Sequence, residues 1–431
     1  MQTFDRLKKN RTFASFAVKK NFKKMKQLIK IITAFSVLIA IQLKAQTPIS
    51  LESAYEYAFK NNLNLKNGQL RIDYHDKIKK SSAVIDPLNV SGEIGQFVSA
   101  YTDNKFSVNQ TFRLPGFYNS QKQVLMEEWK NSMLNLDLQK WQLKREIALI
   151  YNELNYQTEK EKLLLRADSI YTNYYKRAEL RLKKGESNIL EKTTAENYRS
   201  QAEIQLANLK KDREVSLYQF NYLINDETMY SNENSNFYEM NGPTQDLNYA
   251  GNPIVLKQLE QQKAIELAKL NAEKSKLLPT FNIGYNNSSM YGTGADDKFY
   301  ERSARFHSGM IGVGIPLFNG AQKSLIEGQK INQLIAENNY ELGSRNLKNQ
   351  YTTLFGEYEK LKSETDYYKS KGLKNAETIM KTANRLYYEG EINYLEWSIL
   401  INQSLDIQNK LIDTQKLLNE KTIQLNNLTQ Q

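Results

Sequence analysis

An internal duplication constrains the fold of this chain more than any other feature of its sequence. Residues 185–191 read GESNILE and residues 390–396 read GEINYLE, so five of seven positions agree at an offset of 205. Further matches follow at an offset of 201, where Pro115, Phe117, Gln121 and Lys122 correspond to Pro316, Phe318, Gln322 and Lys323, and at 192, where Pro87 corresponds to Pro279. A repeat of this length predicts two copies of one structural unit. We place the copies at 46–225 and 251–431, with 226–250 as the connector.

Each copy contains one segment that is typical of β-strands, at 88–114 and at 280–315. Both segments are rich in aromatic and β-branched residues, Gly, Asn and Ser, and each follows a proline. Apolar side chains alternate with polar or small ones in them, which predicts one β-hairpin per copy. The apolar positions are Phe106, Val108, Phe112, Leu114, Phe281, Ile283, Tyr285, Ile311, Val313 and Ile315. Strands with one apolar and one polar face are typical of transmembrane barrels, although strands of a soluble sandwich alternate in the same way.

The rest of each copy is predicted to be helical. Residues 121–184 contain neither Pro nor Gly, so an unbroken helix there would be roughly 95 Å long. The corresponding run at 321–389 is interrupted only by four glycines. Shorter helices are expected before each hairpin and after each long helix, at 50–83, 187–225, 253–277 and 392–428. Their summed lengths predict two short helices stacked end to end beside each long one.

Residues 1–45 have the composition of a secretory signal peptide. They hold eleven Lys or Arg and one acidic residue, and they continue into an apolar stretch at 31–41 that is too short to span a bilayer. Met25 would start a signal of conventional length, and cleavage after Ala45 would leave a mature chain beginning near Gln46. The remaining chain has 48 basic and 47 acidic residues. The signal therefore accounts for +10 of the net charge of +11, and no nucleic-acid partner is expected.

The chain has few residues of the types that catalyse reactions or bind metals, so we expect no enzyme, no cofactor and no metal site. The chain has no cysteine, and its two histidines, His75 and His307, are expected at the surface. The adjacent acids Glu127 and Glu128 are expected on a solvated helix face. Gly292, Thr293 and Gly294 resemble a loop tip between strands more than a phosphate-binding loop, because no βαβ pattern surrounds them.

The order of helix, hairpin, long helix, glycine turn and helix, repeated twice, resembles the TolC family of outer-membrane efflux proteins. The resemblance covers nearly all of the mature chain. Its local signatures are SLESAYEYAFKNNLNLK at 50–66, Asn221 to Ile224, Asn252 with Pro253, and Leu278 to Phe281. It implies a mainly α protein with a small β part. It also implies a homotrimer with a twelve-stranded β-barrel in outer-membrane lipid, continued by a helical barrel through the periplasm.

The same resemblance implies partners and a cargo class. The channel would dock a periplasmic adaptor (a membrane fusion protein) and an inner-membrane RND transporter. AELRLKKGESNILEKTTAE at 178–196 is most similar to channels that serve heavy-metal pumps, so metal cations are one expected cargo. Two alternatives stay open at this point: a duct for type I protein secretion, and a periplasmic coiled-coil scaffold protein.

The two Gly-Glu turns are the predicted functional sites. Gly185 and Gly390 are expected in a left-handed conformation that ends each long helix, with Glu186 and Glu391 where the next helix begins. By resemblance these turns are the periplasmic tips that contact the adaptor, and basic Arg181 belongs to the first tip. The resemblance also makes Glu396, six residues after Gly390, a candidate for the periplasmic gate. Against these roles stand the simpler interpretations that the glycines only form turns and that Glu396 only faces solvent.

Overall fold

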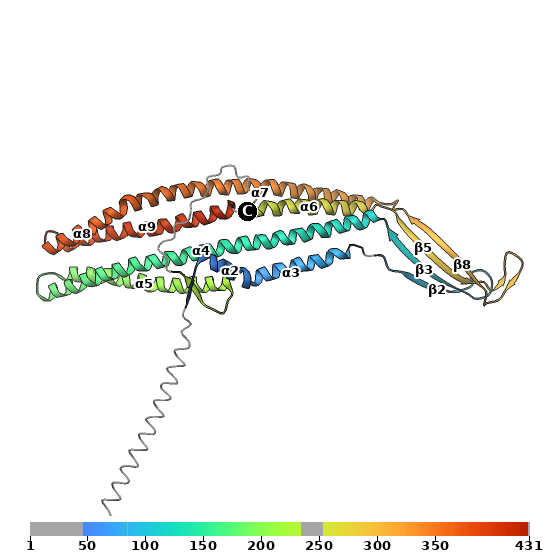
Figure 1. Ribbon diagram of the computed structural model, residues 1–431, viewed down its shortest axis with the longest axis horizontal. Coiled ribbons are helices and arrows are strands. Elements are labelled where there is room, and N and C mark those ends of the chain that lie inside the picture. The colour runs from blue at the N-terminus through green and yellow to red at the C-terminus, as the bar shows by residue number, and fades with distance from the viewer. Residues whose placement is uncertain (1–45, 84, 234–252, 430–431) are drawn as a thin grey trace, which may run out of the picture.

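The computed structural model describes residues 46–83, 85–233 and 253–429, which form a long curved rod of helices with a β-sheet at one end (Figure 1). The predicted signal peptide, 1–45, and most of the predicted connector, 234–250, lie outside the described residues. The first repeat comprises α2 (Leu51–Asn61), α3 (Leu63–Ile78), the 3-10 turn η1 (Lys79–Ala83), β2 (Asn89–Gly95), β3 (Asp103–Arg113), α4 (Pro115–Lys183) and α5 (Ile189–Ile224). The second comprises α6 (Ile254–Ser275), β5 (Thr280–Ser289), β6 (Gly292–Thr293), β7 (Phe299–Tyr300), β8 (Arg305–Gly314), α7 (Gly320–Tyr367), the π turn η2 (Tyr368–Gly372), α8 (Leu373–Glu389) and α9 (Tyr394–Thr429).

The four main strands form one antiparallel sheet in the order β2-β3-β5-β8. Its register aligns apolar residues across strands, as where Phe281 lies between Phe112 and Val313. One face of the sheet exposes large apolar side chains: Val90, Ile94, Phe106, Phe112, Phe281, Ile283, Tyr285, Ile311 and Val313. Strands β2 and β8 have no further partner within the described chain, so both edges of the sheet are open. Gly292 and Thr293, predicted in a loop tip between strands, instead form the short strand β6, which pairs with β7 between β5 and β8.

The helix expected at 50–83 is divided at Asn62. This residue is extended, with φ −65° and ψ 124°, and its side-chain oxygen accepts hydrogen bonds from the backbone N–H groups of Asn64 and Leu65. Asn62 therefore ends α2 and caps α3 at the same position. Its amide also donates to the carbonyl of Leu223 on α5, which fixes the bend against the neighbouring helix.

A short parallel strand pair near the middle of the rod was not predicted. β1 (Thr47–Ile49) pairs with β4 (Tyr230–Asn232), which lies in the segment taken as connector. The hydroxyl of Tyr151 on α4 donates to the carbonyl of Ile49. The pair is packed on an apolar core that contains Ile147, Leu154, Phe220 and Ile224. The start of the described chain is thus attached to the first repeat.

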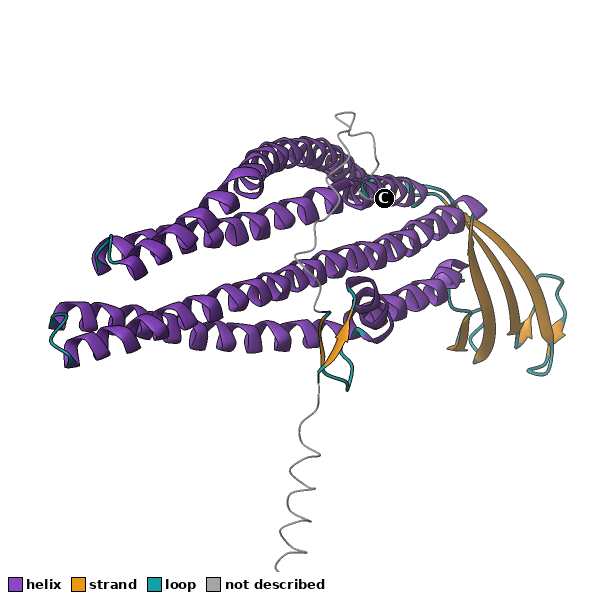
Figure 2. Ribbon diagram, turned by 60° about the vertical axis from the view of Figure 1, so that its left-hand side comes forward, coloured by secondary structure: helices purple, strands orange, loops and turns teal. Residues whose placement is uncertain are grey.

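The second long helix differs from the first at the π turn η2. α4 is continuous over 69 residues, whereas α7 and α8 are joined by five π-helical residues and the run arches away from its neighbours (Figure 2). The offset between the copies grows from 201 at Gln322 to 205 at Gly390, so the second run is four residues longer. Four extra residues rotate the packing face of the later part of the helix away from its neighbour. The wider π turn rotates this face back. At Gly372 an added Cβ would lie 3.0 Å from Cδ1 of Tyr368, so a larger residue there would require this ring to shift.

The expectation of a solvated Glu127 is wrong. Its side chain is buried between α4 and α6, while Glu128 is half-buried. Gln261 on α6 donates one amide to both the backbone carbonyl and the carboxylate of Glu127, at 2.9 and 2.7 Å. Lys130 adds a 2.9 Å contact. The carboxylate can be buried in this interface because each of its oxygens accepts a hydrogen bond.

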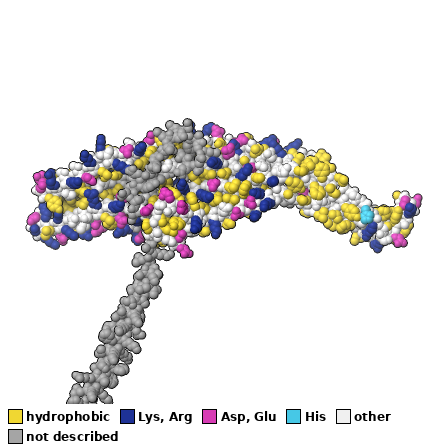
Figure 3. Space-filling view, in the orientation of Figure 1, with side chains coloured by type: hydrophobic (Ala, Val, Ile, Leu, Met, Phe, Trp, Pro, Cys, Tyr) yellow, Lys and Arg dark blue, Asp and Glu magenta, His cyan; other side chains and the backbone are white. Residues whose placement is uncertain are grey.

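No helix in the described part of the chain combines the length and the hydropathy that crossing a membrane would require. The apolar surface gathers instead over the strands and the adjoining helix ends, as the space-filling view shows (Figure 3).

Candidate gate and docking site at the helical tips

Both long helices end in the same turn. Gly185 and Gly390 have φ of +74° and +76°, which confirms the predicted left-handed conformation. In the first turn Gly185 N–H donates to the carbonyl of Leu182, and Glu186 N–H donates to that of Arg181. Tyr387 and Leu386 accept the corresponding two bonds of the second turn. This is the Schellman arrangement, in which a glycine without Cβ satisfies the last carbonyls of a helix.

The following helices begin later than predicted, which changes the position of two acids. Asn188 and Asn393 are the N-cap residues, and their side chains accept from the N–H groups of Glu191 and Glu396. Glu186 and Glu391 therefore precede the caps by two residues and lie, exposed, in the turns themselves. The carboxylates that face the positive ends of α5 and α9 belong to Glu191 and Glu396.

The two equivalent acids make different contacts. Glu396 is exposed and reaches back to the backbone N–H of Asn393 at 3.0 Å, so it completes a capping box on its own helix. Glu191 is only 2% exposed. Its Oε1 accepts from Nη1 of Arg181 at 3.0 Å and from the hydroxyl of Tyr387 at 2.9 Å, and its Oε2 accepts from Ser187.

Arg181, Glu191 and Tyr387 form a contact between the two repeats that we call the tip latch. Arg181 and Glu191 come from the first helical hairpin, and Tyr387 comes from α8 of the second. Arg181 also donates to the backbone carbonyl of Glu186. The guanidinium that was predicted to contact an adaptor is thus already held within the chain, although it remains partly exposed.

Burial and charge keep Tyr387 in its donating form. Burial raises the pKa of the Tyr387 hydroxyl to about 12, and the hydrogen bond to the Glu191 carboxylate acts in the same direction. Burial alone would lower the pKa of Arg181, but the neighbouring Glu191 raises it above its usual value. At neutral pH the latch therefore consists of a cation and a phenol that both donate to one carboxylate.

An aromatic cluster supports the latch. Trp397 lies 4.6 Å from Tyr174 and 5.3 Å from Tyr387, measured between ring centroids, and its indole N–H donates to Asn384. The cluster continues into a core shared by α4, α5, α8 and α9 that includes Tyr171, Ala195, Met380 and Ile401. The two hairpins are consequently joined at the tips by packing as well as by the latch.

Sequence reasoning identified the turns but missed Glu191 and Tyr387. The repeat held a signal for the first of them, because Glu191 and Glu396 are equivalent at the offset of 205. No local pattern indicates that Tyr387 would reach Glu191, since 196 residues separate them.

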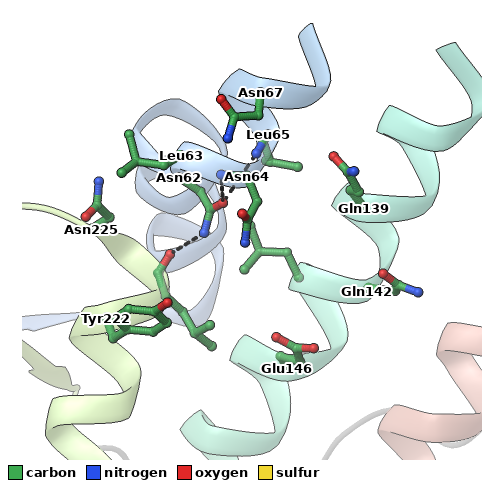
Figure 4. A pocket seen from close by; sticks show the side chains of 12 residues that line it. Asn62, Leu63, Asn64, Leu65, Asn67, Gln139, Gln142, Glu146, Tyr222 and Asn225 are labelled. Atoms are coloured by element: carbon green, nitrogen blue, oxygen red, sulfur yellow. Dashed lines mark hydrogen bonds between the residues drawn. The ribbon is translucent and has the colours of Figure 1, made fainter. Parts of the chain in front are cut away.

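An open cleft of about 420 Å³ near the middle of the rod has no comparable arrangement (Figure 4). Asn62, Asn64, Asn67, Gln139, Gln142 and Asn225 supply most of its polar lining, with Glu146 as its one carboxylate among the described residues. Figure 4 shows the amide of Asn62 bonded to a backbone carbonyl, so this side chain is occupied by structural contacts. Neutral amides neither transfer protons nor act as nucleophiles. The cleft therefore gives no catalytic interpretation.

His75 is half-buried, which differs from the expected surface position, while His307 is exposed.

Comparison with known proteins agrees with this architecture. Residues 251–430 match the model of the outer membrane efflux protein family. The outer-membrane channel OprN is similar in structure, with a TM-score of 0.75 at 14% identity over 88% of this chain and 89% of that one. The CmeC channel of Campylobacter jejuni has a TM-score of 0.73 at 14% identity, over 88% and 85%. The open MtrE channel of Neisseria gonorrhoeae has a TM-score of 0.70 at 15% identity, with 88% of this chain and 88% of that chain covered. No curated protein matches the sequence.

The fold is that of these solved outer-membrane channels, with duplicated helical hairpins and one four-stranded sheet shared by both repeats. The second repeat of this chain matches the outer membrane efflux protein family in sequence, and the described residues share the fold of outer-membrane channels of known structure. The resemblance stated from sequence is confirmed. Members of this family are channels, not enzymes, and lie in the outer membrane with a helical part in the periplasm.

Proposed function

We propose that three copies of this chain form the outer-membrane channel of a tripartite efflux system. The observation that carries the proposal is the four-stranded sheet with an exposed apolar face and two open edges. Open edges leave backbone N–H and C=O groups unpaired, which costs several kcal/mol per group in lipid. Pairing β8 of each copy with β2 of the next removes all edges, and three copies give a closed barrel of twelve strands.

The helices continue the barrel as a periplasmic tunnel in this proposal. α4 has 69 residues, which corresponds to roughly 100 Å. The sheet lies at one end of α4 and the glycine turns lie at the other (Figure 1). With the sheet in the outer membrane, the tips would face the inner membrane. A coiled-coil scaffold gives no role to an exposed apolar sheet face.

The tips would dock the periplasmic adaptor, and through it an inner-membrane RND transporter. Arg181, Gly185 and Glu186 form the first tip, and Gly390 with Glu391 forms the second. The first also exposes Lys183 and Lys184, whereas the second exposes Glu389 and Glu391. Because the two tips carry opposite charge, they support two different kinds of adaptor contact around the periplasmic end of the proposed trimer.

Glu396 is the proposed gate residue. Three symmetry-related carboxylates close to the tunnel end would raise the negative potential there and favour cations. The neighbouring Ile392 and Ile399 are apolar, so packing would contribute more to closure than ion pairs. Metal cations are the cargo class to test first. Type I export of polypeptides is the alternative, because the pump selects what enters such a tunnel.

The first experiment is to fractionate the membranes, extract the native protein gently and measure its oligomeric mass with bound detergent subtracted. A trimer in the outer membrane supports the proposal. A soluble monomer or dimer contradicts it and favours the scaffold. Co-purification of the extracted trimer with its adaptor and pump would then distinguish an RND system from a type I secretion system.

A further inference from the structure

At the end remote from the helices, the exposed apolar face of the sheet gives way to polar side chains that have no role in the proposed channel function. We call these residues the polar belt: Asn104, Asn287, Arg305 and His307. Along β8, Ile311 and Val313 are apolar and exposed, while His307 and Arg305 continue the same alternating face away from the helices. Asn287 pairs with His307 in the register, and Asn104 on β3 contacts Arg305. In Figure 3 the hydrophobic surface over the strands gives way to histidine and charged side chains toward the far end.

The contacts of His307 fix which ring nitrogen is free to bind. Nδ1 lies 2.6 Å from the hydroxyl of Tyr285 and 3.3 Å from Nδ2 of Asn287. Nδ1 is therefore occupied by contacts within the sheet. Within the described residues Nε2 has no partner, so this nitrogen is free to bind a ligand on the exposed face.

Arg305 adds a positive charge that no acid on this face balances. Its guanidinium donates to the neutral side chain of Asn104. Among the described residues no carboxylate forms an ion pair with it, whereas Lys105 on the opposite face pairs with Glu93. Arg305 and His307 are two residues apart on one strand, so their side chains leave the sheet about 7 Å apart. Together they offer several donors and one charge at the boundary of an apolar surface.

We propose that Arg305 and His307 bind the phosphate of a lipid headgroup, with the acyl chains of that lipid along the apolar face of β5 and β8. Guanidinium groups bind phosphate through two parallel hydrogen bonds, and basic groups at the edge of an apolar band select anionic headgroups. This inference rests on the proposed barrel. With the helices in the periplasm, the belt lies at the outer leaflet, because Arg305 is at the end of β8 remote from α7.

The test uses the full native protein in detergent and native mass spectrometry with three probes: lipid A with two phosphates, the same lipid dephosphorylated, and inorganic phosphate. The wild-type protein should retain the phosphorylated lipid about tenfold more than the dephosphorylated one. The double variant R305Q with H307Q should lose this preference, and R305K should keep part of it. R302Q, which removes an exposed arginine in the turn before β8, is the matched control and should leave retention unchanged.

Equal retention of the two lipids by the wild-type protein would overturn the inference without any variant. Binding of inorganic phosphate with no lipid preference would also overturn it, because the belt would then be a free-anion site. The same spectra give the oligomeric mass. A membrane-extracted trimer that lacks the preference refutes only the lipid site, whereas a soluble monomer refutes the proposed channel itself.

Discussion

Tyr387 donates its hydroxyl to Oε1 of Glu191 across 2.9 Å, although 196 residues separate them along the chain. Tyr387 belongs to α8 and Glu191 to α5, so this hydrogen bond joins the ends of the two repeats. Arg181 donates to the same oxygen from α4. Any movement of the second hairpin away from the first must break the contact of Tyr387 while that of Arg181 remains.

Y387F should therefore raise the frequency of channel opening. It removes the hydroxyl and keeps the ring against Trp397, and a hydrogen bond to a charged group contributes roughly 1.5–3 kcal/mol. Opening should become about tenfold more frequent when the protein is reconstituted in planar bilayers and its conductance is recorded. Y222F, at a tyrosine that is 79% exposed, is the control. Equal opening in both variants would show that the latch has no part in gating.

E396Q tests the proposed gate separately from helix stability. Glutamine can still accept from the N–H of Asn393, so the capping box persists and thermal stability should change by less than about 0.5 kcal/mol. Loss of three symmetry-related charges should lower the preference for cations over anions, measured as a reversal potential in a salt gradient. E389Q, an exposed acid just before the turn, is the comparison. An unchanged reversal potential and unchanged opening in E396Q would refute the gate.

The sequence predicted what depends on local pattern. Long helices follow from stretches without Pro or Gly, and hairpins follow from alternation, so the elements themselves were predictable. The division at Asn62 was missed because an N-cap residue was read as part of a helix. The π turn was indicated only by the change in offset from 201 to 205, which shows a length difference but not how the helix accommodates it.

The tip latch could not be derived locally, since its energetics depend on a contact between repeats. The same is true of Glu127. A carboxylate at a helix surface is usually solvated, and its burial here depends on Gln261, which lies 134 residues away. Two more acids make the same contact across α6 and α7: Gln322 donates to the carbonyl and carboxylate of Glu273, and Gln329 donates to those of Glu266.

E127A should lower the free energy of unfolding by about 2–3 kcal/mol, because it leaves the amide of Gln261 without its carboxylate in a buried interface. Urea unfolding of the detergent-solubilised protein, followed by its helical circular dichroism, measures this change. The control E128A removes the half-buried neighbour and should cost less than about 0.5 kcal/mol. Similar losses in both variants would contradict the role given to the contact with Gln261.

Glu127 also predicts a dependence on pH. Burial alone would raise the pKa of its carboxyl, but hydrogen bonds from Gln261 and Lys130 outweigh burial and lower the pKa below its usual value. The folded state therefore binds the proton less readily than the unfolded state. This contribution to stability is present above the unfolded pKa of 4.5 and is lost as the pH falls through the folded value. Between pH 7 and pH 3, E127A should lose less stability than the wild-type protein.

The duplicated turns give the last prediction. Gly185 and Gly390 have positive φ, which costs a residue with Cβ about 1 kcal/mol or more, and each of G185A and G390A should lower stability by that amount. G356A is a matched control inside α7, where an added Cβ would meet nothing within 4 Å and φ is not positive. Alanine is the better helix former, so G356A should raise the free energy of unfolding by about 0.5–1 kcal/mol. If urea unfolding shows a lower free energy of unfolding for G185A and G390A and a higher one for G356A, the loss is due to the left-handed backbone at the two turns. A rise in all three variants would mean that the turns tolerate Cβ and that the glycines are there for another reason.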